Sequence, residues 1–162
     1  MRISNKFANH APIIAWASIV VCVVAGADFA HAALGGSIDT LKTEALEMKA
    51  ASQPRMQTAA GYTIVETTLQ SGTVVRQYAA PGGTVFGVTW SGPYMPNLHK
   101  LLGTSFDSLT GHQSGAKGAG LNALQIREDN LVIESYAHMH AYSGRAYLPR
   151  NFPSGVTPGV LR

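Results

Sequence analysis

Hydrophobic and polar positions show their clearest strand pattern in the middle of the chain. Residues 62–69, 73–79 and 84–90 are three runs rich in Val, Ile, Thr, Tyr and Phe. Ser71-Gly72 separates the first two runs, and Pro81-Gly82-Gly83 separates the last two. Short runs of β-branched and aromatic residues between such turn residues are typical of strands. The pattern therefore predicts a three-stranded antiparallel meander.

The pairing register of this meander depends on the lengths of its turns. If both turns are two-residue loops, Thr67 lies opposite Arg76, and Arg76 lies opposite Gly87. The face that we expect to form the core would then carry Ile64, Val75, Ala79, Phe86, Val88 and Trp90, with Glu66 and Gln77 as opposed neighbours. A slip of one residue in the first turn would exchange the two faces for residues 62–69, and this alternative stays open.

Helical patterns flank the meander. Ser37 can cap a helix over residues 38–51, in which an apolar stripe opposes charged positions. Asn97 can cap a short helix through Leu98, Leu101 and Leu102. Residues 110–120 contain four glycines and predict a mobile loop. They do not form a phosphate-binding loop, because Lys117 is followed by Gly118 where that motif needs a hydroxyl residue.

Alternation returns near the end of the chain, where Leu131, Ile133, Ala137, Met139 and Ala141 provide an apolar face. If Ser143-Gly144 turns the chain as a two-residue hairpin, Arg145 falls opposite Tyr142 and Tyr147 falls opposite His140. The other face would then carry what we call the Tyr/His strip, which consists of Tyr136, His138, His140, Tyr142, Arg145 and Tyr147.

These elements together predict an α+β fold. We expect an antiparallel sheet of about five strands, made of the three-stranded meander and a C-terminal hairpin. An N-terminal helix and a short helix after the meander would complete the fold.

The N-terminal residues have the three-part pattern of an export signal. Residues 1–10 carry Arg2 and Lys6 and no acidic side chain, and residues 11–26 are almost wholly apolar. Ala30-His31-Ala32 places small residues at both recognition positions of a signal peptidase. We expect cleavage after Ala32 and a periplasmic or secreted product.

The segment left after cleavage, residues 33–162, has the length of one α+β domain, with a core at about residues 60–150. We expect no membrane span in it. A single membrane anchor is the alternative for the N-terminal residues, but their apolar run, about 15 residues, is shorter than the roughly 20 that cross a bilayer as a helix. Cys22 is the only cysteine and lies in the signal, so disulfides and thiolate sites are not expected. The formal charge of +3 is too small to point to nucleic acid.

The Tyr/His strip is the main candidate for ligand binding. Its tyrosines and Arg145 can stack on and hydrogen-bond a sugar or an anionic polymer, and Arg76 is a further candidate as an anion clamp. His138 and His140 would point the same way from a strand and could share a metal. The alternative without any ligand is cross-strand packing that stiffens the hairpin. We expect no cofactor.

Motifs for hydrolysis are missing from the sequence. It has no Gly-x-Ser-x-Gly elbow, and Asp107 is the only aspartate between Asp39 and Asp129 that could orient a base. An enzyme would need a site around Glu66 and Arg76, with a cleft and a carboxylate free of a structural partner.

A set of short segments spread over the expected mature chain carries a family resemblance. The segments are Ala33 to Gly36, Ser71 to Arg76, Tyr78, Pro81, Gly83, Val85-Phe86, Val88, Trp90, Gly92-Pro93, Pro96 to Leu98, Leu101 to Gly103 and Gly144 to Pro149. With them, much of the expected mature chain resembles a bacterial family called domain of unknown function 2844. The resemblance implies an envelope or secreted protein. It transfers no activity, cofactor or catalytic residue.

Three hypotheses for the function follow. The first is a non-catalytic binding or accessory module of the bacterial envelope, whose partner is an envelope polymer or a protein. The second is a periplasmic metal-binding protein that uses His138 and His140. The third is a hydrolase-like enzyme, with its site around Glu66 and Arg76.

Overall fold

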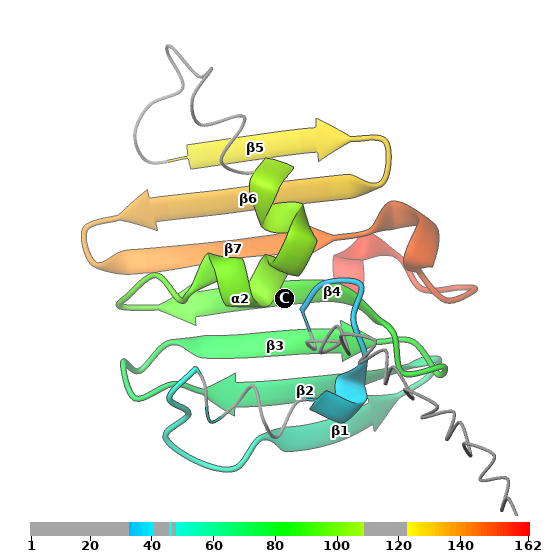
Figure 1. The fold of residues 1–162 in the computed structure, drawn as a ribbon, viewed down its shortest axis with the longest axis horizontal. Helices are drawn as coiled ribbons and strands as arrows, with labels where there is room; N and C mark the ends of the chain where they lie inside the picture. Colours follow the sequence, from blue (N-terminus) through cyan, green and yellow to red (C-terminus); the bar gives the residue numbers. More distant parts are fainter. Residues whose placement is uncertain (1–32, 41–45, 47, 109–122) are drawn as a thin grey trace, which may run out of the picture.

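The computed structural model describes residues 33–40, 46, 48–108 and 123–162. The expected export signal, residues 41–45 and 47 of the expected N-terminal helix, and the glycine-rich loop lie outside the described residues. The described ends of that helix are not α-helical, because Ile38–Thr40 form a 3-10 turn and Ala50 forms an isolated β-bridge with Leu69. Seven strands form one antiparallel sheet in the order β1-β2-β3-β4-β7-β6-β5 (Figure 1). The strands are β1 (Arg55–Ala59), β2 (Tyr62–Thr68), β3 (Val74–Ala79), β4 (Val85–Gly92), β5 (Ala123–Glu128), β6 (Leu131–His138) and β7 (Ala141–Tyr147).

In the described part of the chain, α2 (Leu98–Leu102) is a short α-helix, and residues 106–108 are also helical. The predicted cap is confirmed, since the Asn97 side chain accepts a hydrogen bond from the amide of Lys100. The described residues also form the single 3-10 turns η1 (Ile38–Thr40), η2 (Gly103–Ser105), η3 (Pro149–Asn151) and η4 (Pro158–Val160). No helix among the described residues has both the length and the apolar character needed to cross a membrane.

The predicted meander is confirmed as β2-β3-β4, but the expectation of about five strands is wrong because β1 and β5 extend the sheet. β1 is an edge strand in which Arg55 to Thr58 are all exposed. Main-chain pairing with β2 holds β1 in place. Because its side chains are exposed, the sequence of β1 shows no hydrophobic alternation. In β5, Leu124 and Ile126 do alternate with Gln125 and Arg127, which is a usable strand signal.

The predicted register of the meander is also wrong. Glu66 pairs with Arg76, and Thr89 lies opposite Arg76 on the other side. Both loops have three residues instead of two, because Leu69 pairs with Thr73 and Ala80 pairs with Thr84. Gly72 and Gly83, with φ of +84° and +82°, provide the left-handed position that three-residue loops require. A bulge between Tyr78 and Ala79 shifts the register between β3 and β4 further.

The alternative with a slip of one residue is therefore the correct one for β2. Val65 and Thr67 face the same side as Val75 and Trp90, whereas Ile64 and Phe86 lie on the opposite side against Tyr78.

The expected turn at Ser143-Gly144 is wrong as well. Met139 and His140 form the two-residue loop, with φ of +34° and +63°, and His138 lies opposite Ala141. Ser143 and Gly144 are strand residues of β7. Gly144 is required there because a Cβ atom would overlap the ring of the buried Trp90 on β4. A close packing contact, and not a turn, explains this glycine.

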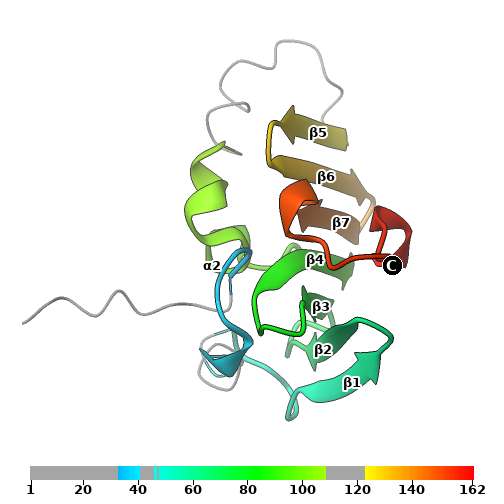
Figure 2. The same ribbon diagram turned by 90° about the vertical axis from the view of Figure 1, so that its right-hand side faces the viewer.

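Both faces of the sheet carry buried clusters. Figure 2 shows α2 and the N-terminal segment on one side of the sheet and the C-terminus on the other. On the side of α2, the N-terminal segment and the helix cover the larger cluster, with Leu34, Leu101 and Leu102 packed against the strands. The C-terminal segment, residues 149–162, covers part of the other side, where Leu161 packs with Tyr78. The rest of that second side stays open, and we call it the open face.

We expect Gly144→Ala to lower the free energy of unfolding by about 1–3 kcal/mol, because the added methyl group must displace the Trp90 ring. Denaturant unfolding of the purified protein measures this effect. Gly82→Ala is the matched control, since a Cβ at Gly82 meets no atom within 4 Å and should change stability by less than about 0.5 kcal/mol. Equal stability of both variants would contradict the packing of Trp90 on Gly144.

Candidate ligand-binding site

A continuous row of polar side chains crosses the open face at the middle of the strands. The antiparallel registers place these residues opposite one another on successive strands, and residues paired in this way point to the same side of a sheet. We call them the polar row, which consists of Arg55, Glu66, Arg76, Thr89, Arg145, Glu134 and Gln125.

Arg76 joins the row to the C-terminal segment. Its Nε donates a hydrogen bond of 2.8 Å to Glu66, and its Nη1 donates one of 3.2 Å to the main-chain oxygen of Arg162. The hydroxyl groups of Tyr78 and Thr89 donate to the same oxygen over 2.9 and 3.4 Å. Three donors therefore converge on one acceptor oxygen above β3 and β4.

Arg145 is held by Glu134 on the neighbouring strand. Glu134 is only 5% exposed and accepts hydrogen bonds from Arg145, Arg127 and Gln125 at 2.8, 3.2 and 3.1 Å. Burial raises the pKa of Glu134, but these hydrogen bonds and the charges of Arg145 and Arg127 outweigh it and hold the pKa below its ordinary value. Glu134 therefore remains ionised at neutral pH and fixes the Arg145 guanidinium.

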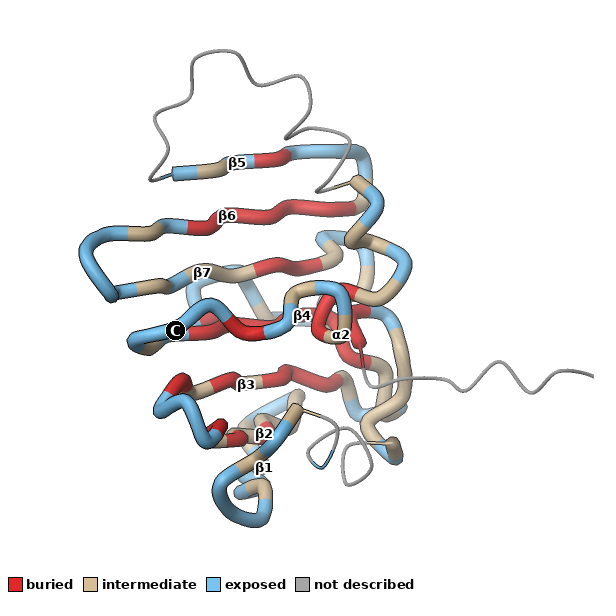
Figure 3. Tube along the Cα trace, turned by 60° about the vertical axis from the view of Figure 1, so that its left-hand side comes forward, coloured by how far each residue is buried: buried red, intermediate tan, exposed pale blue. Residues whose placement is uncertain are grey.

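A hollow of about 410 Å³ lies between these two arginines. The residues that line it include three arginines, Arg76, Arg145 and Arg162, and one glutamate, Glu134. The hydroxyl groups of Ser91 and Ser143 and the ring of Tyr136 extend the lining toward the β6–β7 turn. Tyr136 is 49% exposed, and the turn beyond it is exposed in Figure 3.

The structure divides the predicted Tyr/His strip. Tyr136, His138, Arg145 and Tyr147 point to the same side of the sheet as the polar row, but Tyr142 pairs with Ala137 and points to the other side. Tyr147 is buried, with its ring 5.6 Å from that of Phe152. Tyr136, Arg145 and Arg76 line the hollow, and both histidines are outside it.

The two histidines do not form the expected pair on one strand. His138 is the last residue of β6, and His140 lies in the turn. Over the part of the chain that the structure describes, no three His, Cys, Asp or Glu side chains lie close enough to hold a metal ion.

Several residues of the site were not among those predicted from the sequence. Thr89, Ser91 and Ser143 contribute hydroxyl groups, and Gln125 and Arg127 support Glu134 from β5. The alternation of Gln125 and Arg127 with apolar residues is the sequence signal for the last two. The hydroxyl residues carry no comparable signal, because Ser and Thr are common on any exposed strand face.

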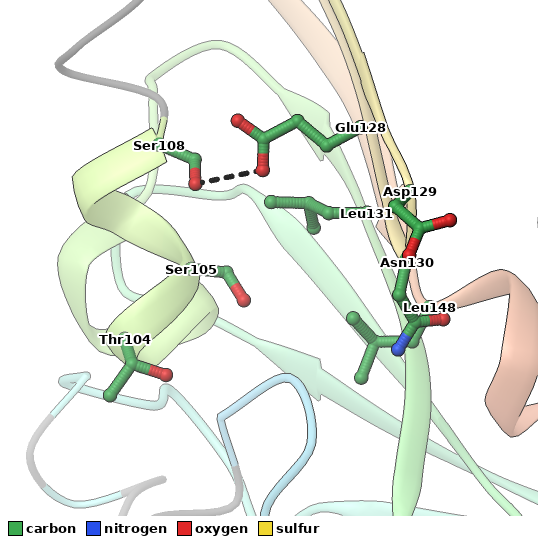
Figure 4. A pocket seen from close by; sticks show the side chains of 8 residues that line it. All are labelled: Thr104, Ser105, Ser108, Glu128, Asp129, Asn130, Leu131 and Leu148. Atoms are coloured by element: carbon green, nitrogen blue, oxygen red, sulfur yellow. Dashed lines mark hydrogen bonds between the residues drawn. The ribbon is translucent and has the colours of Figure 1, made fainter.

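A second hollow, of about 370 Å³, lies on the opposite side of the sheet between the segment after α2 and the β5–β6 turn (Figure 4). Its side chains are Thr104, Ser105, Ser108, Glu128, Asp129, Asn130, Leu131 and Leu148. Ser108 donates a hydrogen bond of 3.1 Å to Glu128, and Arg150 forms an ion pair of 2.6 Å with Asp129. These polar groups join neighbouring elements, so this hollow is the weaker candidate.

Comparison with known proteins supports the family resemblance. The family model described as protein of unknown function (DUF2844) matches residues 30–161. The chain belongs to this family. No curated protein and no solved structure matches it. The match covers every strand of the DUF2844 sheet and every residue of the polar row.

Glu134 should make the stability of this DUF2844 protein depend on pH. Because its pKa is lowered in the folded state, the ionised carboxylate stabilises the fold above the ordinary carboxyl pKa of 4.5, and this contribution is lost as the pH falls through the folded value. Glu134→Gln should cost about 1–2 kcal/mol at pH 7 by weakening the charged hydrogen bonds, and the difference from the parent should narrow toward pH 3. Denaturant unfolding at several pH values measures this.

The control for this experiment is Asp129→Asn. Asp129 forms an ion pair with Arg150, but its side chain is 81% exposed, so its loss should change stability by less than about 1 kcal/mol. A constant difference between Glu134→Gln and the parent at all pH values would contradict the assigned role of Glu134.

Proposed function

We propose that this protein is an exported, non-catalytic binding module of the bacterial envelope, and that it holds its ligand in the hollow on the open face. The observation that supports this most strongly is the pair of arginines at the hollow, each held by a glutamate. Arg76 and Arg145 are both 36% exposed, so they are fixed in direction but remain accessible. Preorganised donors lose less entropy when a ligand binds.

The exposed ring of Tyr136 also favours binding. A tyrosine presents a large flat surface and a hydrogen-bonding hydroxyl group at a low cost in conformational entropy, and such side chains are enriched where proteins bind partners. The N-terminal segment and α2 cover the opposite side of the sheet, so they leave Tyr136 accessible.

The geometry favours binding over hydrolysis. The enzyme hypothesis required a carboxylate without a structural partner near Arg76. Glu66 is instead paired with Arg76 at 2.8 Å, and Glu134 is paired with Arg145 at 2.7 Å. In these positions the carboxylates serve to orient the guanidinium groups.

The proposed location depends on the N-terminal residues, where the basic, apolar and small-residue regions follow the order of an export signal. An exported binding module would meet envelope polymers or envelope proteins. The ligand of the hollow is therefore to be sought among these partners.

A thermal-shift screen of the purified protein tests this function. The ligands are cell-wall glycans, acidic and neutral polysaccharides, small carboxylates and divalent metals. At least one ligand should raise the melting temperature, and Tyr136→Ala should abolish the shift. Tyr94→Ala is the matched control, because Tyr94 is 60% exposed but does not line the hollow. Stabilisation that persists in Tyr136→Ala would place the site elsewhere.

A further inference from the structure

We infer that the ligand of the hollow is an acidic polysaccharide, with the carboxylate of a sugar unit between Arg76 and Arg145 and the sugar ring on Tyr136. This inference rests on the proposed binding function and specifies its ligand class. It combines three features of the lining: the excess of positive charge, the direction of the donors and the exposed aromatic ring.

The first feature is charge. Three arginines and one glutamate, Glu134, are among the residues that line the hollow. Glu66 pairs with Arg76 and Arg127 pairs with Glu134, so four arginines face two glutamates in and around the hollow. A partly enclosed site of this composition attracts anions, because the protein around it screens the charges less than water does. A neutral ligand would leave the excess charge uncompensated.

The second feature is the geometry of the donors. Arg145 uses Nε and Nη2 to bind Glu134, and its guanidinium carbon lies 5.9 Å from the centre of the Tyr147 ring. Arg76 on β3 and Arg145 on β7 lie on either side of Thr89 on β4. Strands β3 and β7 are therefore about 10 Å apart, twice the spacing of neighbouring strands. A carboxylate between them can accept hydrogen bonds from both arginines, whose planar forks suit it.

The hollow already has one bound acceptor oxygen at its border, the main-chain oxygen of Arg162. Arg76, Tyr78 and Thr89 all direct a donor to that oxygen, at the border of the hollow. Arg76 and Thr89, two of the residues that bind this oxygen, therefore line the same hollow as Arg145.

The third feature indicates a sugar. Tyr136 borders the hollow next to Ser143, and Ser91 lies beside Ser143 on β4. An exposed aromatic ring can stack on the C–H face of a sugar, while serine hydroxyl groups can exchange hydrogen bonds with its hydroxyl groups. A volume of about 410 Å³ is at the lower end of the range for small-ligand sites, and a hollow on an open sheet face admits a unit of a longer chain.

The decisive experiment is calorimetric titration of the purified protein with oligogalacturonate and with the same oligomer after methyl esterification of its carboxylates. The acidic oligomer should bind at least tenfold more tightly than the ester. Its affinity should fall as salt is raised, because added ions screen the charges. Tyr136→Ala should raise the Kd at least tenfold, and Tyr94→Ala should leave it unchanged.

Arg145→Lys tests the guanidinium directly. Lysine retains the positive charge but cannot form the two-pronged contact, so the Kd should rise at least fivefold. Arg150→Lys is the control, since Arg150 binds Asp129 away from the hollow. Should Arg145→Lys fail to fold, as judged by circular dichroism, the comparison of acid with ester and the salt dependence decide the question without it.

The outcomes separate this inference from the proposed function. One outcome is that the acidic oligomer and its methyl ester bind equally tightly and both lose binding in Tyr136→Ala. That result would contradict the inference of an acidic ligand but would support the binding site. Tighter binding of a sulfated polysaccharide than of oligogalacturonate would contradict the inference that the group between the two arginines is a carboxylate. If no ligand in either experiment binds in a way that depends on Tyr136, the site itself and the proposed function both fail.

Discussion

Strand β4 pairs with β7 from Gly87–Tyr147 to Gly92–Tyr142, and this pairing joins two meanders that are separate in the sequence. The first meander is β1 to β4, and the second is β5 to β7. Both faces of the sheet depend on this junction. On one side it buries Trp90 against Gly144, and on the other it places Thr89 opposite Arg145. The hollow exists because residues from both meanders meet there.

The two sides of the junction are coupled by the alternation of the strands. Gly144 provides space for Trp90 on the covered side, and its neighbours Ser143 and Arg145 necessarily point to the open face. A shift of β7 by one residue would remove the space for Trp90 and would also turn Arg145 into the core. Packing of a large indole thus helps to fix the register that aligns the polar row, because a one-residue slip exchanges the faces of a strand.

The sequence predicts the strands of this protein better than their registers. The alternation over residues 62–90 is sufficient to place β2, β3 and β4, but loops that are one residue longer than assumed reverse the face of β2. Ser143-Gly144 carries the stronger turn signal, whereas the actual turn at Met139-His140 has no typical turn residue. Arg76, Arg145 and Tyr136 are identifiable as candidates from composition and alternation. Their meeting at one hollow depends on the pairing of β4 with β7, which no local pattern reveals.

The glutamates of the open face are better explained by orientation than by stability. Burying an ion pair costs desolvation energy that its attraction only partly offsets, so an apolar pair would hold the sheet as well. Glu134 nevertheless lies almost fully buried beneath Arg145, and Glu66 supports Arg76 in the same way on the other side of the junction. Each carboxylate restricts a long side chain that would otherwise sample many rotamers. Two arginines held in this way at one hollow form a rigid cationic surface, which is the arrangement that a site for an acidic ligand requires.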